Sequence, residues 1–438
     1  MASTEGRETI DALSSEFDYF DQPTLQTAIE NEYDHYLGPL ATLQAGAPIE
    51  FLYKGIPRTF VDLNNSKLEI KCKLTLENGH DLTANDHVGP VNLLLHSLFK
   101  TVDMELCDTQ VTEPGQLYPY RAYLETLNNY DELVLKTRMY NEGWKKDTAG
   151  EVDDTDPAGA NTGLGDRAAR FPLSRVVTLI GRPHLDLFHQ DKDIPANCNI
   201  KLRLLPNSNP WLLKTAAPNQ NAQVNYKVEI TSARLYLRLK TVSPSLAVQL
   251  NDMLLEKNYR IDYTKVSMKQ LHIPAGANNL TFGNVFTGQI PDRVIACLVQ
   301  DNALAGSYVL NPFHFQHFDM SQIVFKVNGQ QIPAIALEPN FTSGDYIREY
   351  HYCLESLGYD TGPQMIDLNP TEWATGYTFF VFKLTPGPIG QVRSLSASGA
   401  ASLEIKFRTP TTQNLSVLLL SQQAAVLEID KFGHVINS

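Results

Sequence analysis

Apolar and polar residues alternate strictly through Ser66–Glu77 (SKLEIKCKLTLE). Successive side chains of a β-strand point to opposite faces, so this period of two predicts a strand with one buried face. The same alternation recurs at Asn199–Leu204, Ala233–Thr241, Ile323–Val327 and Leu403–Phe407. Helical patterns are short and cover Val91–Phe99, Tyr120–Asn128, Leu246–Glu256 and Glu349–Leu357. The pattern therefore predicts an all-β chain of the sandwich type with a few short helices.

Three pairs of similar segments occur in the same order, each pair separated by about half of the chain. They are His96–Val111 with His317–Ile332, Tyr120–Leu127 with Tyr350–Leu357, and Ile200–Arg203 with Ile405–Arg408. Each match is short, but their common order predicts a tandem duplication of a domain of about 200 residues.

We divide the chain into four parts on this basis. They are an N-terminal arm (1–45), a first sandwich (46–222), a second sandwich (223–430) and a C-terminal tail (431–438). The polar segment Thr215–Val224, interrupted by Pro218, is the most linker-like stretch between the halves. Lys145–Arg167 is rich in Gly and Asp, and we expect it to form a long loop at the outer surface.

The chain is acidic and sparing in charge. It has 49 Asp and Glu against 36 Lys and Arg, a net charge of −13, and charged residues make up 19% of it. Phosphate binding needs clustered basic side chains, so this balance argues against coating of DNA and against specific nucleic-acid recognition. The low charged fraction indicates extensive burial between subunits.

The densest histidine pairs are His184/His189 and His314/His317. In a strand, spacings of five and three place the two imidazoles on opposite faces, so we expect structural histidines and no metal site. The sequence also lacks phosphate-binding glycine motifs and a nucleophile elbow. We therefore expect no catalytic residue, no cofactor and no enzymatic activity.

The cysteines are odd in number and far apart: Cys72, Cys107, Cys198, Cys297 and Cys353. None forms a C-x-x-C motif, so we expect small apolar strand residues rather than a zinc or redox site. The first residues have no signal-peptide character, and no apolar run reaches the roughly 18 residues of a membrane-spanning helix. These features predict a soluble protein that folds in a reducing compartment.

The expected arm carries apolar residues in a polar stretch that contains Pro23. These candidate assembly anchors are Phe17, Tyr19, Phe20, Leu25 and Ile29. We expect the arm to become ordered only on docking beneath a neighbouring subunit or on another protein of the same assembly.

Several segments resemble one known family. They are Gly89–Phe99 (GPVNLLLHSLF), Gly181–Pro195 (GRPHLDLFHQDKDIP), Gly288–Gln300 (GQIPDRVIACLVQ) and Asn311–Pro333 (NPFHFQHFDMSQIVFKVNGQQIP), joined by Phe17–Glu30 and Leu235–Leu246. They resemble the major capsid (hexon-type) proteins of Polinton/Maverick elements and their adintovirus relatives.

The resemblance implies a double jelly roll, two tandem eight-stranded sandwiches. Three such chains would form a pseudo-hexagonal homotrimeric capsomer that tiles an icosahedral shell around a DNA genome. The implied partners are neighbouring capsomers and penton or minor capsid proteins, and the implied location is the virion.

Three alternatives stay open beside this interpretation. A minor capsid or penton-like protein is disfavoured by the duplication, because a penton subunit normally needs one roll. A tandem jelly-roll carbohydrate-binding protein is disfavoured by the missing secretion signal. A two-domain cupin metalloenzyme is disfavoured by the histidine spacings.

Overall fold

The computed structural model describes residues 26–113, 115–216, 225–361, 365–385 and 398–437. The strands of the first sandwich are β1 (Ile29–Leu37), β2 (Ile49–Tyr53), β3 (Thr59–Leu76), β5 (Phe99–Leu106), β6 (Thr109–Gln110), β7 (Val177–Gly181), β8 (Ile200–Pro206) and β10 (Tyr226–Val242). Those of the second are β11 (Tyr259–Ile273), β12 (Asn279–Gln289), β13 (Arg293–Gln300), β14 (Met320–Val327), β15 (Gln330–Leu337), β16 (Phe379–Lys383), β17 (Ser398–Phe407) and β18 (Leu415–Ile429).

Short elements lie beside these sheets. The remaining strands are β4 (Val88–Pro90), β9 (Leu213–Thr215) and β19 (Val435–Asn437). The α-helices are α1 (Leu94–Ser97), α2 (Tyr118–Asn129), α3 (Glu132–Lys136), α4 (Thr162–Ala168), α5 (Asn209–Leu212), α6 (Pro244–Glu256), α7 (Asp301–Ala305), α8 (Ile347–Leu357) and α9 (Pro370–Ala374). Among the described residues the 3₁₀ turns are η2 (Met139–Glu142), η3 (Pro172–Ser174) and η4 (Asp186–His189).

The two sandwiches have the same strand order. The first has sheets β1-β10-β3-β7 and β2-β8-β5-β6, and the second has β11-β18-β13-β16 and β12-β17-β14-β15. Counted along each sandwich, both read 1-8-3-6 and 2-7-4-5, which is the order of an eight-stranded jelly roll. The chain is an all-β double jelly roll with short helices, as predicted.

The predicted strand at Ser66–Glu77 lies in β3, and its apolar face is in the core. Leu68, Ile70, Cys72 and Leu74 are each at most 1% exposed. Burial of one aliphatic side chain of this size contributes roughly 1.5–3 kcal/mol. The alternation read from the sequence is therefore confirmed as a half-buried strand.

The three repeated sequence pairs fall on equivalent elements. The first pair forms the hairpins β5–β6 and β14–β15, the second forms α2 and α8, and the third lies in β8 and at the end of β17. The internal repeat is therefore a repeat of structure as well as of sequence.

Strand pairing corrects two of the predicted boundaries. Residues 226–242 were expected in the second sandwich, but β10 pairs with β1 and with β3 in the first. Residues 29–37 were expected in the arm, but β1 pairs with β10 along its length. A jelly roll places its last strand beside its first, so the linker-like segment before β10 lies inside a domain. The connection between the sandwiches is α6.

The Gly- and Asp-rich segment Lys145–Arg167 is a surface loop only in part: residues 158–160 are exposed, as predicted, but Asp147, Asn161 and Arg167 are buried. Asp147 and Arg167 form an ion pair of 2.6 Å with side chains 0% and 2% exposed. Asn161 caps α4 and also donates from Nδ2 to Asp147 (2.8 Å). Polar composition did not predict exposure because these side chains form ion pairs and hydrogen bonds with one another inside the protein.

Two of the cysteines are paired, which corrects the expectation that all five are unpaired strand residues. Cys107 follows β5 and Cys198 precedes β8, and a disulfide joins them with a Cα–Cα distance of 5.4 Å. The antiparallel pairing of β5 with β8 brings these strand ends together. Cys72, Cys297 and Cys353 are free and buried.

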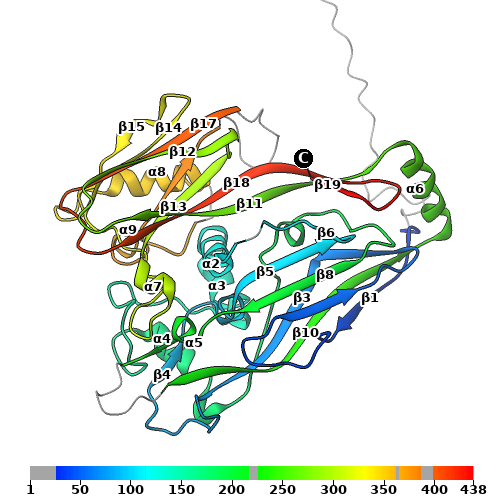
Figure 1. Cartoon of the computed structure of the whole chain (residues 1–438), viewed down its shortest axis with the longest axis horizontal. Helices are drawn as coiled ribbons and strands as arrows, with labels where there is room; N and C mark the ends of the chain where they lie inside the picture. Colours follow the sequence, from blue (N-terminus) through cyan, green and yellow to red (C-terminus); the bar gives the residue numbers. More distant parts are fainter. Residues whose placement is uncertain (1–25, 114, 217–224, 362–364, 386–397, 438) are drawn as a thin grey trace, which may run out of the picture.

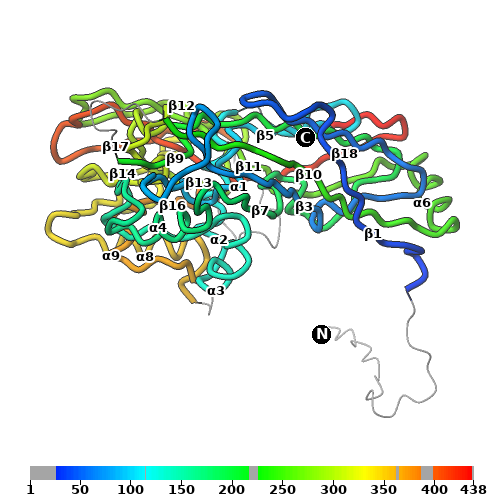
Figure 2. Tube along the Cα trace, turned by 90° about the horizontal axis from the view of Figure 1, so that it is seen from below, coloured from blue at the N-terminus to red at the C-terminus, as the bar shows by residue number. Residues whose placement is uncertain are grey.

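The second sandwich lies above the first in Figure 1, and α2 lies between them. In Figure 2, β1 and α6 lie at the same end of the molecule. The backbone joins these two elements, since Ser243 N donates to Ala28 O (2.9 Å). No helix among the described residues is long and apolar enough to cross a membrane.

Candidate functional site

The contact between the two sandwiches, here called the junction, is where the structure gathers most of its buried charge. Arg121 of α2 donates from Nε to Glu125 (3.0 Å) and from Nη2 to Asp186 Oδ1 (2.6 Å). The same Asp186 oxygen accepts from the backbone N–H of Val266 in β11 (3.2 Å). A buried charge is tolerated only when it is paired and hydrogen-bonded. This network therefore fixes β11 of the second sandwich against α2 of the first.

The pKa values of the two carboxylates, Glu125 and Asp186, shift in opposite directions. Burial raises the pKa of Glu125, but Arg121 and His184 outweigh burial and hold that pKa below its usual range. Burial also raises the pKa of Asp186, and there Arg121 does not fully offset it. Both shifts come from placing carboxyl groups beside a guanidinium in a dry environment.

An aromatic cluster forms the apolar part of the junction. Phe313, from the second half, is 0% exposed and stacks on Tyr123 of α2 with ring centroids 4.1 Å apart. Tyr120 and Trp211 approach the same ring edge-on, at 5.7 and 5.4 Å. Because offset and edge-to-face pairs are the favoured aromatic geometries, Phe313 anchors the second half in the first.

The segment 145–167 adds a polar clamp to the junction. Tyr377 donates its hydroxyl to Asp147 O (2.8 Å), and Asn311 Nδ2 donates to Val152 O (3.0 Å). His314 Nδ1 lies 2.5 Å from Asp153 Oδ2. These contacts use carbonyls and carboxylates of one half and side chains of the other, so they hold the halves in a single orientation.

Lys214 of β9 is a further buried charge at the junction. Its side chain is 0% exposed, and Nζ donates to the carbonyls of Ser307 (2.5 Å) and Leu310. Burial lowers the pKa of Lys214 to about 7, although Asp153 and Asp147 oppose the shift. A neutral amine keeps two N–H donors, one for each carbonyl.

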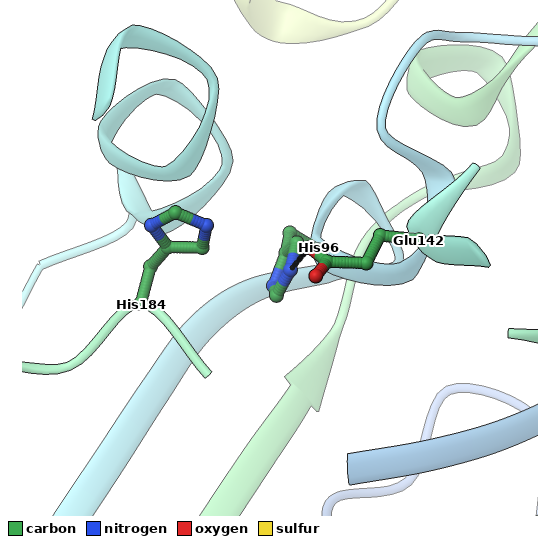
Figure 3. Close-up of side chains that lie close together, drawn as sticks. All are labelled: His96, Glu142 and His184. Atoms are coloured by element: carbon green, nitrogen blue, oxygen red, sulfur yellow. Dashed lines mark hydrogen bonds and ion pairs between the residues drawn. The ribbon is translucent and has the colours of Figure 1, made fainter. Parts of the chain in front are cut away.

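Histidines and carboxylates gather beside the junction, as Figure 3 shows for three of them. His96 Nε2 lies 2.8 Å from Glu142 Oε2, and His184 Nδ1 lies 2.6 Å from Glu125 Oε2. His189 is exposed, and its ring lies 5.5 Å from that of His184.

This arrangement corrects the argument from histidine spacing. His184 precedes η4 and His189 ends it, so the two residues are not in a strand and their rings approach each other. His314 and His317 do take separate partners, Asp153 and the ring of Phe341. Nothing in the sequence could reveal His96 and Glu142 as neighbours of His184, since they come from segments far apart in the chain.

The candidate assembly anchors are placed only in part. Phe17, Tyr19, Phe20 and Leu25 lie outside the described residues. Ile29 is half-buried in β1, where it pairs with Val242 of β10. Ile29 is therefore a residue of the sheet and not of a free arm.

One end of the molecule exposes apolar side chains. No residue of α6 is buried, and Val248, Met253 and Leu255 are 59%, 62% and 68% exposed. The edge strand β1 begins beside α6 at Ile29, and Tyr36, near its other end, is 67% exposed. Exposed apolar groups next to an unpaired strand edge are typical of a surface that contacts another protein.

Comparison with known proteins gives structural matches over the whole chain. No family model matches the sequence. An uncharacterized protein of Caenorhabditis elegans is 24% identical over 380 residues, covering 83% of this chain and 86% of that protein.

Three of the solved structures that match come from viruses or virophages. A Sputnik virophage structure aligns with 100% of this chain and 94% of its own (TM-score 0.63, 12% identity). The Faustovirus major capsid protein covers 96% of this chain and 93% of its own (TM-score 0.59, 10% identity). The mavirus major capsid protein covers 100% and 97% (TM-score 0.56, 11% identity). The fold is that of viral major capsid proteins.

Proposed function

We propose that this chain is a major capsid protein, and that three copies form a pseudo-hexagonal capsomer that tiles an icosahedral shell around a DNA genome. The observation that carries the proposal is the repeated jelly roll with a buried junction, aligned over its full length with virophage and viral capsid structures. Two similar units in each of three chains give six similar wedges, which can pack hexagonally.

The rigidity of the junction supports this role. A capsomer keeps its outline only if the two rolls of each chain hold one angle. Arg121, Phe313 and Lys214 each link the two halves through buried contacts. The exposed apolar residues of α6 and the edge strand β1 supply surfaces for contact with a neighbouring chain.

The organism of the similar Caenorhabditis elegans protein indicates which group of capsid genes this chain comes from. It comes from an animal, Caenorhabditis elegans, whereas the Sputnik, mavirus and Faustovirus structures are viral. A capsid fold with an animal sequence relative supports the assignment to Polinton/Maverick elements and adintovirus-like viruses. In this assignment the protein acts in the virion and its partners include penton or minor capsid proteins.

Electron microscopy of the purified full chain tests the proposal. We expect particles with a hexagonal outline and, at higher concentration or with its minor proteins, closed shells. Particles the size of one chain, each with a single pair of sandwiches, at every concentration would contradict the proposal.

The residues before β1 are proposed to link capsomers. Deleting residues 1–25 leaves β1 and its pairing with β10 intact, so we expect trimers to form and shells to fail. Replacing Phe17, Tyr19 and Phe20 together with Ser should do the same. The matched control, Ser14→Ala with Ser15→Ala, should assemble normally. If the deletion variant forms normal shells, the residues before β1 do not link capsomers.

A further inference from the structure

Three side chains from separate segments of the first half converge beside the junction. His96 lies in α1, Glu142 ends η2, and His184 follows β7. Their exposed fractions are 1%, 6% and 3%, and one nitrogen or oxygen from each lies within 4.8 Å of the others. Figure 3 shows the ring of His96 between His184 and Glu142. Two imidazoles and a carboxylate are a ligand set that zinc-class ions prefer.

Neighbouring groups orient both imidazoles. Glu125 Oε2 lies 2.6 Å from His184 Nδ1, which places a proton on Nδ1 and leaves the Nε2 lone pair free. The Tyr118 hydroxyl lies 2.9 Å from His96 Nδ1, while His96 Nε2 faces Glu142. In metal sites, a carboxylate or another polar group on the second ring nitrogen holds a ligating histidine in this way.

The charge of the cluster is unbalanced without a cation. Glu125, Glu142 and Asp186 are buried carboxylates, and Arg121 is the buried cation paired with two of them. With neutral imidazoles this set carries two net negative charges, and burial of uncompensated charge is strongly unfavourable. A single dication would neutralise the set.

The backbone leaves room for the carboxylate. A Cβ built on Gly181 would lie 2.4 Å from Cδ of Glu142, so a larger residue at 181 would displace the Glu142 side chain. The position of Glu142 beside His96 therefore depends on glycine at the end of β7.

We propose that His96, Glu142 and His184 bind one zinc-class divalent ion, with Tyr118 and Glu125 as the groups that position the two imidazoles. Ligand atoms around a four-coordinate zinc are about 3.3 Å apart. His96 Nε2 and Glu142 Oε2, now 2.8 Å apart, would therefore separate slightly, and His184 would approach them from at most 4.8 Å. For His96 Nε2 to bind the ion, the single ring proton moves to Nδ1, which donates it to the Tyr118 oxygen, so the imidazole stays neutral. The ion would tie α1 and η2 to the segment that carries Asp186, and thus strengthen the contact with β11. The proposal does not depend on the capsid function.

Metal titration of the full-length protein tests the site. The protein is stripped with a chelator and titrated with Co²⁺, followed by displacement with Zn²⁺. We expect one ion per chain, the visible absorption of four-coordinate cobalt, and a higher Tm with either ion. Absence of stoichiometric binding at micromolar concentrations of both ions would overturn the proposal, and the buried hydrogen bonds would then be purely structural.

Variants separate ligands from neighbours. Glu142→Gln and His184→Gln should each weaken Co²⁺ binding at least about tenfold, and Tyr118→Phe should weaken it by about tenfold. His272→Gln, an exposed histidine that pairs with Asp301, is the matched control and should bind as the wild type does. Circular dichroism and Tm of the metal-free variants confirm that they are folded. Wild-type affinity in folded Glu142→Gln would contradict the assignment.

Discussion

Helices α2 and α8 occupy the same place in the two jelly rolls, yet they meet different surroundings. In α2, every residue from Tyr118 to Asn128 is buried, because this helix lies between the sandwiches. In α8 one face is buried against β16, and the opposite face is exposed. The repeat fixes where the helix lies, and the neighbouring sandwich decides how much of it is covered.

The difference appears at equivalent residues. Arg121 and Glu125 of α2 correspond to His351 and Glu355 of α8 in the sequence repeat. The first two are buried and form ion pairs, whereas the second two are exposed. A charge on the covered helix needs partners, and one on the peripheral helix needs only water.

The largest effect should come from breaking this buried network. Arg121→Met leaves Glu125 without its main cation and Asp186 without its guanidinium, so we expect a loss of about 3–5 kcal/mol in the free energy of unfolding. Urea denaturation followed by circular dichroism measures it.

His351→Met on α8 is the matched control, and it should stay within about 0.5 kcal/mol of the wild type. Equal losses for both variants would mean that the two helices are not as different as their burial indicates.

The next effect concerns the buried amine at the junction. The pKa of Lys214 is about 10.4 in the unfolded chain and about 7 in the folded chain. The unfolded state thus binds more protons between these values, and stability should rise with pH in that window. Asp153 and Asp147 face the amine and oppose the shift.

Lys214→Met should remove this rise, which is on the order of 3 kcal/mol between pH 7 and pH 9.5. The measurement is the urea midpoint at the two pH values. Lys406→Met, at an exposed position in β17, should keep the wild-type dependence. If stability depends on pH in the same way in the wild type and in Lys214→Met, the buried amine does not cause the rise.

The smallest expected change in stability concerns the turns of the two equivalent hairpins, β5–β6 and β14–β15. Asn328-Gly329 joins β14 to β15 with φ values of 50° and 84°, whereas Cys107-Asp108 joins β5 to β6 with φ values of 48° and 63°. Glycine adopts positive φ without steric cost and aspartate does not. Asp108→Gly should therefore stabilise the protein by about 1 kcal/mol, and Gly329→Asp should destabilise it by about as much. Shifts of Tm in the same direction for both would contradict this.

Local patterns predicted much of the fold. The alternation in Ser66–Glu77 identified β3, the helical patterns at Tyr120–Asn128 and Glu349–Leu357 identified α2 and α8, and the repeated segments identified the duplication. These features depend on side chains close together in sequence. The place of β10 depends on its pairing with β1 and β3 across the chain, and the linker-like residues before it gave the wrong domain boundary.

The candidate site was largely hidden for the same reason. Cys107 and Cys198 meet because β5 pairs with β8, and His96, Glu142 and His184 meet because three segments fold together. Asp147 and Arg167 read as surface residues, yet each satisfies the other in the interior. A sequence shows which groups are polar, but only the tertiary structure shows which of them are partners.

The mass of the full chain in solution tests the central claim most directly. Light scattering coupled to size exclusion should give about 147 kDa, three times the 49.0 kDa of one chain. A single species of 49.0 kDa at all concentrations would contradict the trimeric capsomer.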